Sequence, residues 1–133
     1  MILVDTSIWI ELQRPGQTLK LPGRLQVRLA TCGPVIQEVL QGESLARSLT
    51  SFRSALLALP RYGDPLPLEL FLRAAERYQW GRARGLTIRS SVDCLIAAIA
   101  LAHQLPVWHQ DRDFDAIARF TPLRVISGLR RAW

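Results

Sequence analysis

Short runs of mostly apolar residues recur along the chain and are separated by longer segments with a helical pattern. Ile2 to Val4, Val107 to His109 and Leu123 to Ile126 are runs of this kind. Continuous apolar runs of this length are typical of strands that are covered on both faces of a parallel sheet. We therefore expect a strand at each of the three places.

The segments between these runs carry apolar residues at helical spacing, with residues at their ends that start or stop helices. The two longest are separated by Pro60, Gly63, Pro65 and Pro67, so they should form a helical hairpin in the middle of the chain. The order of strands and helices predicts an α/β fold, with a small parallel sheet and right-handed crossovers. The expected helical segments are Thr6 to Leu12, Leu21 to Leu29, Pro34 to Leu40, Leu45 to Leu59, Leu68 to Arg84, Ser91 to His103 and Phe114 to Arg119.

Length and composition favour one compact domain over residues 1–133. The 133 residues are 49% hydrophobic and 21% charged, which excludes a disordered chain. The longest apolar stretch, Cys94 to Ala102, is too short to cross a bilayer, and no basic segment precedes the first apolar residues. Cys32 and Cys94 lack the spacing of a zinc or redox motif, so we expect free, buried thiols and a cytoplasmic protein.

The charge balance points to a polyanionic partner. The formal net charge is +6, and Lys20 is the single lysine, so arginine supplies nearly all the positive charge. Guanidinium groups form two parallel hydrogen bonds with phosphate, which suits them to nucleic acid.

Several acids lie where a parallel sheet would gather them. Asp5 follows the first strand, Asp111 and Asp113 follow the strand at Val107, and Asp93 lies in the first turn of a helix. Ligands of open parallel sheets bind beyond the carboxyl ends of the strands, which is the edge these residues share. Each aspartate taken singly also fits a helix cap, a turn or a first-turn acid, so only their combination argues for a site. Carboxylates gathered in this way imply a bound cation or a shared proton.

Four motifs together resemble the PIN domain, and specifically the VapC-type ribonuclease toxins. They occur in the order and near the spacing of that family, and the resemblance covers the whole chain. The motifs are Val4-Asp5-Thr6-Ser7-Ile8-Trp9-Ile10, Pro34-Val35-Ile36-Gln37-Glu38-Val39-Leu40, Ser91-Val92-Asp93-Cys94-Leu95-Ile96-Ala97-Ala98 and His109-Gln110-Asp111-Arg112-Asp113-Phe114.

The resemblance implies a three-layer α/β/α fold and a metal-dependent endoribonuclease that is held inactive by a VapB-type antitoxin. It also implies a homodimer, and a heterotetramer or larger assembly with the antitoxin. Periodicity does not place Glu38 beside the aspartates, and the resemblance adds it to the site. The chain departs from many relatives at His109-Gln110, where they have Thr-Arg or Thr-Asn. By resemblance the metal-binding and catalytic acids are Asp5, Glu38, Asp93 and Asp111, with Asp113 as a further ligand. The hydroxyls of Thr6 or Ser7 are expected near the metal, where they would contact the substrate.

The chemistry of phosphodiester hydrolysis agrees with this acid set. Mg²⁺ or Mn²⁺ can activate water and neutralise charge on the phosphate, and both ions prefer oxygen ligands. His103 and His109 lack the spacing of a transition-metal site. An RNA substrate needs cations around an acidic pocket, and Arg89 and Arg112 are the best placed to supply them.

Two other functions compete with this hypothesis. A PIN-like module could bind RNA or protein without cleaving anything, although an intact acid set argues against a degenerate site. A phosphoacceptor domain of the receiver type also gathers aspartates at a sheet edge. That domain needs a lysine after a late strand, and Lys20 is far from one.

Overall fold

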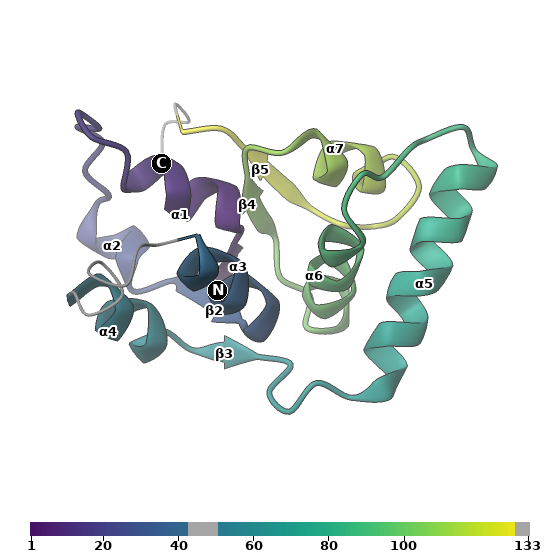
Figure 1. The fold of residues 1–133 in the computed structure, drawn as a ribbon, viewed down its shortest axis with the longest axis horizontal. Helices are drawn as coiled ribbons and strands as arrows, with labels where there is room; N and C mark the ends of the chain where they lie inside the picture. Colours follow the sequence, from purple (N-terminus) through teal and green to yellow (C-terminus); the bar gives the residue numbers. More distant parts are fainter. Residues whose placement is uncertain (43–50, 130–133) are drawn as a thin grey trace.

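A computed structural model describes residues 1–42 and 51–129 (Figure 1). The strands and helices alternate along the chain, as the sequence pattern predicts. The strands are β1 (Ile2–Val4), β2 (Leu29–Cys32), β3 (Arg61–Tyr62), β4 (Val107–His109) and β5 (Val125–Ser127). The helices are α1 (Thr6–Leu12), α2 (Gly23–Gln26), α3 (Gly33–Gln41), α4 (Ser51–Ala58), α5 (Leu68–Ala83), α6 (Ser91–Ala102) and α7 (Arg112–Ala118).

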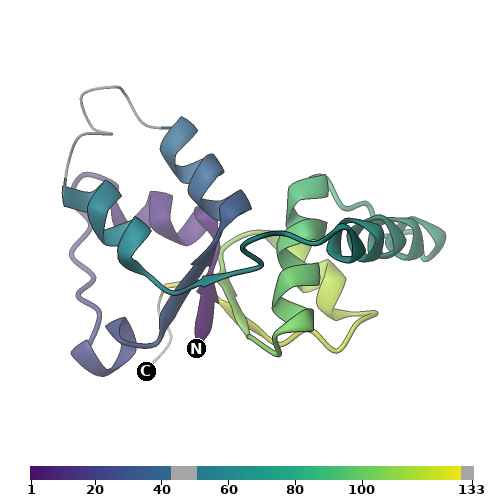
Figure 2. The ribbon, with the colours of Figure 1, turned by 90° about the horizontal axis from the view of Figure 1, so that it is seen from below.

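The strands form one parallel sheet in the order β3-β2-β1-β4-β5, with β1 at its centre. Helices α1 to α4 lie on one side of the sheet and α6 and α7 cover its other face, so the molecule has three layers, with α5 packed on the outer side of α6 (Figure 2). Every residue of β1, β2 and β4 is buried, because helices cover both faces of these strands. The predicted three-layer α/β/α class is therefore confirmed.

Three local predictions differ from the structure. Residues 21–29 have helical spacing, but only the single turn α2 forms, and Leu29 pairs with Ile2 as the start of β2. Arg61 pairs with Thr31 to make β3 inside the stretch of prolines and glycines. Both strands are defined by pairing partners about 30 residues away, which local periodicity cannot reveal.

The two middle helices do not pair with each other as the predicted hairpin. Strand β3 separates them, and they lie on opposite faces of the sheet (Figure 2). Helix α4 packs near α3, whereas α5 packs along α6 and also contacts α7. Residues 45–50, which the prediction assigned to the first of these helices, lie outside the described residues.

The core confirms the prediction made for the two cysteines. Cys32 and Cys94 are buried free thiols, and Trp9 and Trp108 are buried beside them in the same core. Helix α6 buries seven of its residues, which its alanines allow because small side chains let the neighbouring layers approach closely. In the part of the chain that the structure describes, no helix has the length and apolar character needed to cross a membrane.

Candidate metal centre

The carboxyl edge of the two central strands positions the predicted acids. Asp5 directly follows β1, and its backbone N–H extends the pairing with β4 by donating to Trp108 O at 2.9 Å. Asp111 comes two residues after β4, and Asp93 lies in the first turn of α6. Glu38 comes from the middle of α3, which follows β2. Because the strands are parallel, their carboxyl ends meet at one edge of the sheet, and these acids lie at that edge.

Two of the aspartates, Asp5 and Asp111, also begin helices. Asp5 is the N-cap of α1 and accepts from Ser7 N at 3.0 Å. Asp111 is the N-cap of α7 and accepts from Asp113 N at 2.9 Å. Asp113 lies inside the first turn of α7, and the cap of that helix is Asp111. One oxygen of each N-cap carboxylate is used by the cap, and the other stays available.

The carboxylates form two groups that share Asp93. Asp5, Glu38 and Asp93 each offer an oxygen within 4.8 Å of the others, and so do Asp93, Asp111 and Asp113. Asp5, Asp93 and Asp113 are buried, whereas Glu38 and Asp111 are partly exposed. The structure therefore brings together all five acids that the sequence predicted. Asp93 belongs to both groups, and the cluster is exposed to solvent at Glu38 and Asp111.

The hydroxyls of the first motif hold the acids in place. Thr6 Oγ1 donates to Glu38 Oε1 at 3.0 Å, and this bond ties α3 to α1. Ser7 Oγ donates to Asp5 Oδ2 and accepts from Gln110 N at 3.0 Å. Both hydroxyls are therefore engaged with protein groups, which favours a role in orienting the acids over the direct contact with substrate that the sequence suggested.

Two carboxylate oxygens in the cluster have no hydrogen-bond partner among the described residues. They are Asp5 Oδ1 and Asp93 Oδ2, and both are buried. An unpaired buried carboxylate oxygen is costly, so such atoms usually have a partner that belongs to the function. A divalent cation held by Asp5 and Asp93 would give both oxygens a partner. The donor set consists of carboxylate oxygens alone, which fits a hard cation such as Mg²⁺ or Mn²⁺.

The pKa values of the acids show the electrostatic strain of the cluster. Burial and, after it, the charges of Asp5, Asp111 and Asp113 together raise the pKa of Asp93 to about 9. Burial also raises the pKa of Asp5 and of Glu38, although hydrogen bonds from Ser7 and Thr6 act in the opposite direction. Without a cation, Asp93 therefore keeps a proton at neutral pH, and a bound cation would take its place.

Asp113 and the two predicted arginines lie at the rim of this centre. Asp113 Oδ2 accepts from Arg89 N at 3.1 Å and from Ser90 N at 3.0 Å, so Asp113 also fixes the start of α6. The Arg89 side chain is 57% exposed, and its Nε lies 4.0 Å from Asp113 Oδ1. Arg112 is exposed in the first turn of α7. Both guanidinium groups are thus accessible to a phosphate backbone.

His109 is buried and belongs to neither group of acids. Its ring is buried and tilted against Phe114, and its Nδ1 accepts from Asp111 N at 3.1 Å. Its Nε2 lies 3.3 Å from Asp115 Oδ1, although the geometry there is outside that of a hydrogen bond. The ring therefore supports the backbone of Asp111. Sequence reasoning left the surroundings of Asp111 open and missed this contact.

Comparisons with known proteins agree with the geometry. The PIN domain model matches residues 2–120. The VapC ribonuclease Mb1587 of Mycobacterium bovis and the ribonuclease VapC11 of Mycobacterium tuberculosis are each 36% identical to the chain, over 96% of it and 98% of their own length. Among solved structures, VapBC2 from Rickettsia felis, bound to a DNA fragment from its promoter, matches with a TM-score of 0.71 and 17% identity, over 96% of this chain and 99% of that one. The chain therefore belongs to the PIN domain family and, within it, to the VapC-type ribonucleases.

Proposed function

We propose that the chain is a metal-dependent endoribonuclease, the toxin of a type II toxin–antitoxin pair, with Mg²⁺ or Mn²⁺ at the acid cluster. The observation that carries the proposal is the pair of buried, unpartnered oxygens, Asp5 Oδ1 and Asp93 Oδ2, within a set of five carboxylates. Sequence identity of 36% to two VapC ribonucleases over nearly the whole chain supports the substrate class.

The residues of the chain have distinct tasks in this mechanism. Asp5, Glu38, Asp93 and Asp111 would hold the cation, and Asp113 would complete the second group of acids. When bound, the cation supplies a Lewis acid that activates water and neutralises charge on the phosphate. Thr6 and Ser7 keep Glu38 and Asp5 oriented through their hydroxyls. Arg89 and Arg112 would receive the phosphates on either side of the cut, which gives affinity without base selection.

Cleavage of total RNA tests this proposal. The purified chain, freed of any inhibitor, is incubated with total RNA and Mg²⁺ or Mn²⁺, and the new 5′ ends are mapped. Asp93→Asn should abolish the cuts, because Asp93 belongs to both groups of acids. Asp64→Asn is the matched control, since Asp64 is an exposed aspartate paired with Arg61 and lies outside both groups. Cuts that persist in Asp93→Asn or in excess chelator would refute the mechanism.

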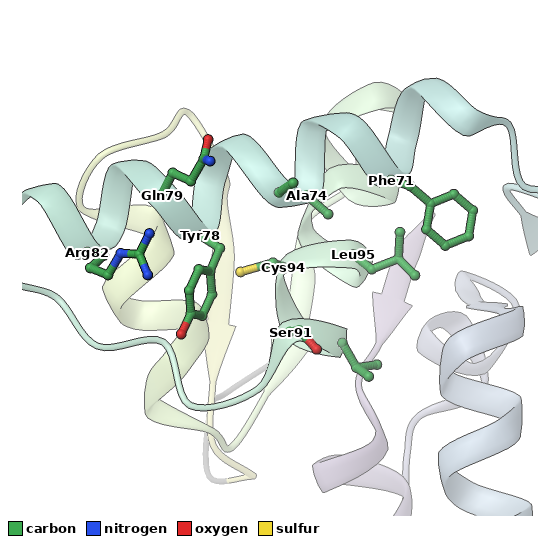
Figure 3. A pocket seen from close by; sticks show the side chains of 10 residues that line it. Phe71, Ala74, Tyr78, Gln79, Arg82, Ser91, Cys94 and Leu95 are labelled. Carbon is green, nitrogen blue, oxygen red and sulfur yellow. The ribbon is translucent and has the colours of Figure 1, made fainter.

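A VapB-type antitoxin and a second copy of the chain are the protein partners of this function. A groove of about 540 Å³ lies between α5 and α6, and Phe71, Ala74, Tyr78 and Leu95 form much of its apolar lining (Figure 3). Phe71, Leu72 and Trp80 of α5 are about half exposed, which is unusual for large apolar side chains unless they meet a partner. These features support partner contacts on α5. The cytoplasm is the compartment that cleavage of cellular RNA requires.

A further inference from the structure

A cavity of about 720 Å³ lies next to the metal centre, and we call it the Glu11 cavity. Its walls come from α1, from the segment between α1 and α2, and from the segments that follow β4 and β5. Its volume is in the ordinary range for small-ligand sites. The residues that matter for the argument are Glu11, Gln17, Thr18, Leu19, Gln110 and Leu129.

Hydrogen bonds link the Glu11 cavity directly to the metal centre. Gln110 lines the cavity and directly precedes Asp111, and its backbone N–H donates to Ser7 Oγ at 3.0 Å. Ser7 Oγ in turn donates to the Asp5 carboxylate. Gln110 in the wall of the cavity is therefore adjacent to one of the acids, Asp111, and is joined to another, Asp5, through Ser7. A nucleotide whose phosphate lies at the acids would bring a neighbouring base to this cavity.

The walls are fixed before any ligand arrives. In one wall, Gln17 N donates to Arg14 O at 3.0 Å and Gln17 Oε1 accepts from Leu19 N at 2.9 Å. In the other, Gly128 N donates to His109 O and Trp108 Nε1 donates to Gly128 O, both at 2.8 Å. A site that is already formed needs little ordering on binding and can therefore select its ligand by shape and hydrogen bonding.

The chemistry of the lining fits an uncharged ring with polar edges. Among the described residues that line the cavity, Glu11 is the only charged one, and its Oε2 lies 3.3 Å from Nη2 of Arg14, whose side chain is largely exposed. A carboxylate repels a phosphate but accepts hydrogen bonds from the exocyclic amino group of a base. Leu19 and Leu129 can pack on the faces of a ring, while the amides and hydroxyls meet its edges.

We propose that the Glu11 cavity binds the nucleobase next to the scissile phosphate and favours cytosine, adenine or guanine over uracil, with Glu11 accepting from the amino group. This inference rests on the proposed ribonuclease function. Uracil has no exocyclic amino group: it carries carbonyl oxygens at C2 and C4, which the Glu11 carboxylate repels, and its only base donor is the ring N3–H between them. The cavity would thus set the sequence preference that the phosphate contacts cannot supply.

The test is a cleavage profile on a randomised single-stranded RNA with Mn²⁺, read by sequencing the new ends. The wild-type chain should disfavour uracil about tenfold at one position beside the cut, the discrimination expected of one good base contact. Glu11→Gln should remove this preference, because glutamine both donates and accepts, and it should raise KM on the preferred sequence with kcat little changed. Glu69→Gln is the matched control, since Glu69 is also a helix carboxylate paired with an arginine, Arg73, and lies outside the cavity. Thr18→Val is a second variant that should weaken the preference from the other wall.

The outcomes separate this inference from the proposed function. Cleavage with the same base profile in wild type, Glu11→Gln and Thr18→Val would overturn the inference and leave the ribonuclease intact. If the wild type cuts no RNA, the proposed function fails, and the cavity is judged by NMR titration with the four nucleoside monophosphates. Saturable shifts of the Gln17 and Gln110 side-chain amides that are weakest with UMP would then support base binding. No saturable shift with any of the four would refute it.

Discussion

Thr6 and Glu38 are 32 positions apart in the chain, and the Thr6 hydroxyl donates to the Glu38 carboxylate at 3.0 Å. This bond crosses from α1 to α3 and brings a partly exposed glutamate to the buried aspartates. Outer hydrogen bonds of this kind fix the direction of a ligand and strengthen metal binding. Thr6, the residue after Asp5, therefore orients the Glu38 carboxylate.

Thr6→Val should lower Mn²⁺ affinity and cleavage by about 10- to 100-fold, the usual loss when such a supporting hydrogen bond is removed. Valine keeps the volume and the branched shape of threonine, so the thermal stability should change little. Thr6→Ser retains the hydroxyl and should recover most of the affinity. Titration calorimetry with Mn²⁺ measures the effect, and equal affinity in Thr6→Val and wild type would show that Glu38 needs no such support.

The stability of the metal-free chain should fall as the pH rises. The pKa of Asp93 is raised to about 9 from 3.8, so the folded state holds a proton that the unfolded state has lost. The stabilising contribution of this proton is complete below pH 3.8 and is lost as the pH rises through about 9. The unfolding temperature in chelator should therefore decrease steadily from pH 5 to pH 9.

Asp93→Asn should flatten this dependence, because asparagine does not titrate, and it should raise the unfolding temperature of the metal-free chain at pH 8. Mn²⁺ should stabilise the wild type more at pH 8 than at pH 5.5, since the cation must replace a proton. Differential scanning fluorimetry with and without chelator measures both effects. Asp64→Asn should behave as wild type, and a pH profile unaltered by Asp93→Asn would assign the dependence to other groups.

His109 should support Asp111 through one ring nitrogen. Nδ1 accepts from Asp111 N at 3.1 Å, and an asparagine oxygen can take the place of this nitrogen, whereas leucine has no acceptor. We expect His109→Asn to keep most of the Mn²⁺ affinity even if it loses stability through a cavity in the core. His109→Leu fills the space better but should reduce Mn²⁺ affinity about tenfold by releasing the Asp111 backbone. If His109→Leu is the more stable variant but binds Mn²⁺ more weakly than His109→Asn, the ring positions Asp111. If the variant that loses more stability also loses more Mn²⁺ affinity, His109 serves packing alone.

The exposed apolar side chains of α5 should be needed for partner binding. Phe71→Asp places a charge in the apolar groove between α5 and α6 and should weaken self-association or antitoxin binding at least about tenfold. Val27→Asp is the matched control, because Val27 is 78% exposed and lies outside the groove. Light scattering measures the assembly, and titration with the antitoxin measures its affinity. Unchanged values in Phe71→Asp would remove α5 from the interface.

Local patterns predicted most elements of the fold, and the exceptions share one cause. Strands β1 and β4 are continuous buried runs, and α3 begins with a proline in its first turn, so composition and spacing were enough there. Strand β3 has two residues and exists because Arg61 and Tyr62 pair with β2. A strand this short has no periodicity of its own, and its identity comes from its neighbour.

The sequence alone determined which chemical groups are available to this protein. It supplied the acids, placed four of them after strands or at the start of a helix, and showed the motifs of the family. The tertiary structure decided how those acids meet. It placed Asp93 in both groups of acids and left Asp5 Oδ1 and Asp93 Oδ2 without hydrogen-bond partners among the described residues. It also brought the Thr6 and Ser7 hydroxyls to Glu38 and Asp5, and it formed the Glu11 cavity next to the acids. The physical reason is that residue type and local spacing fix which groups lie at a strand end or helix start. Burial, mutual repulsion and hydrogen bonds between distant residues arise only when the sheet brings those ends together.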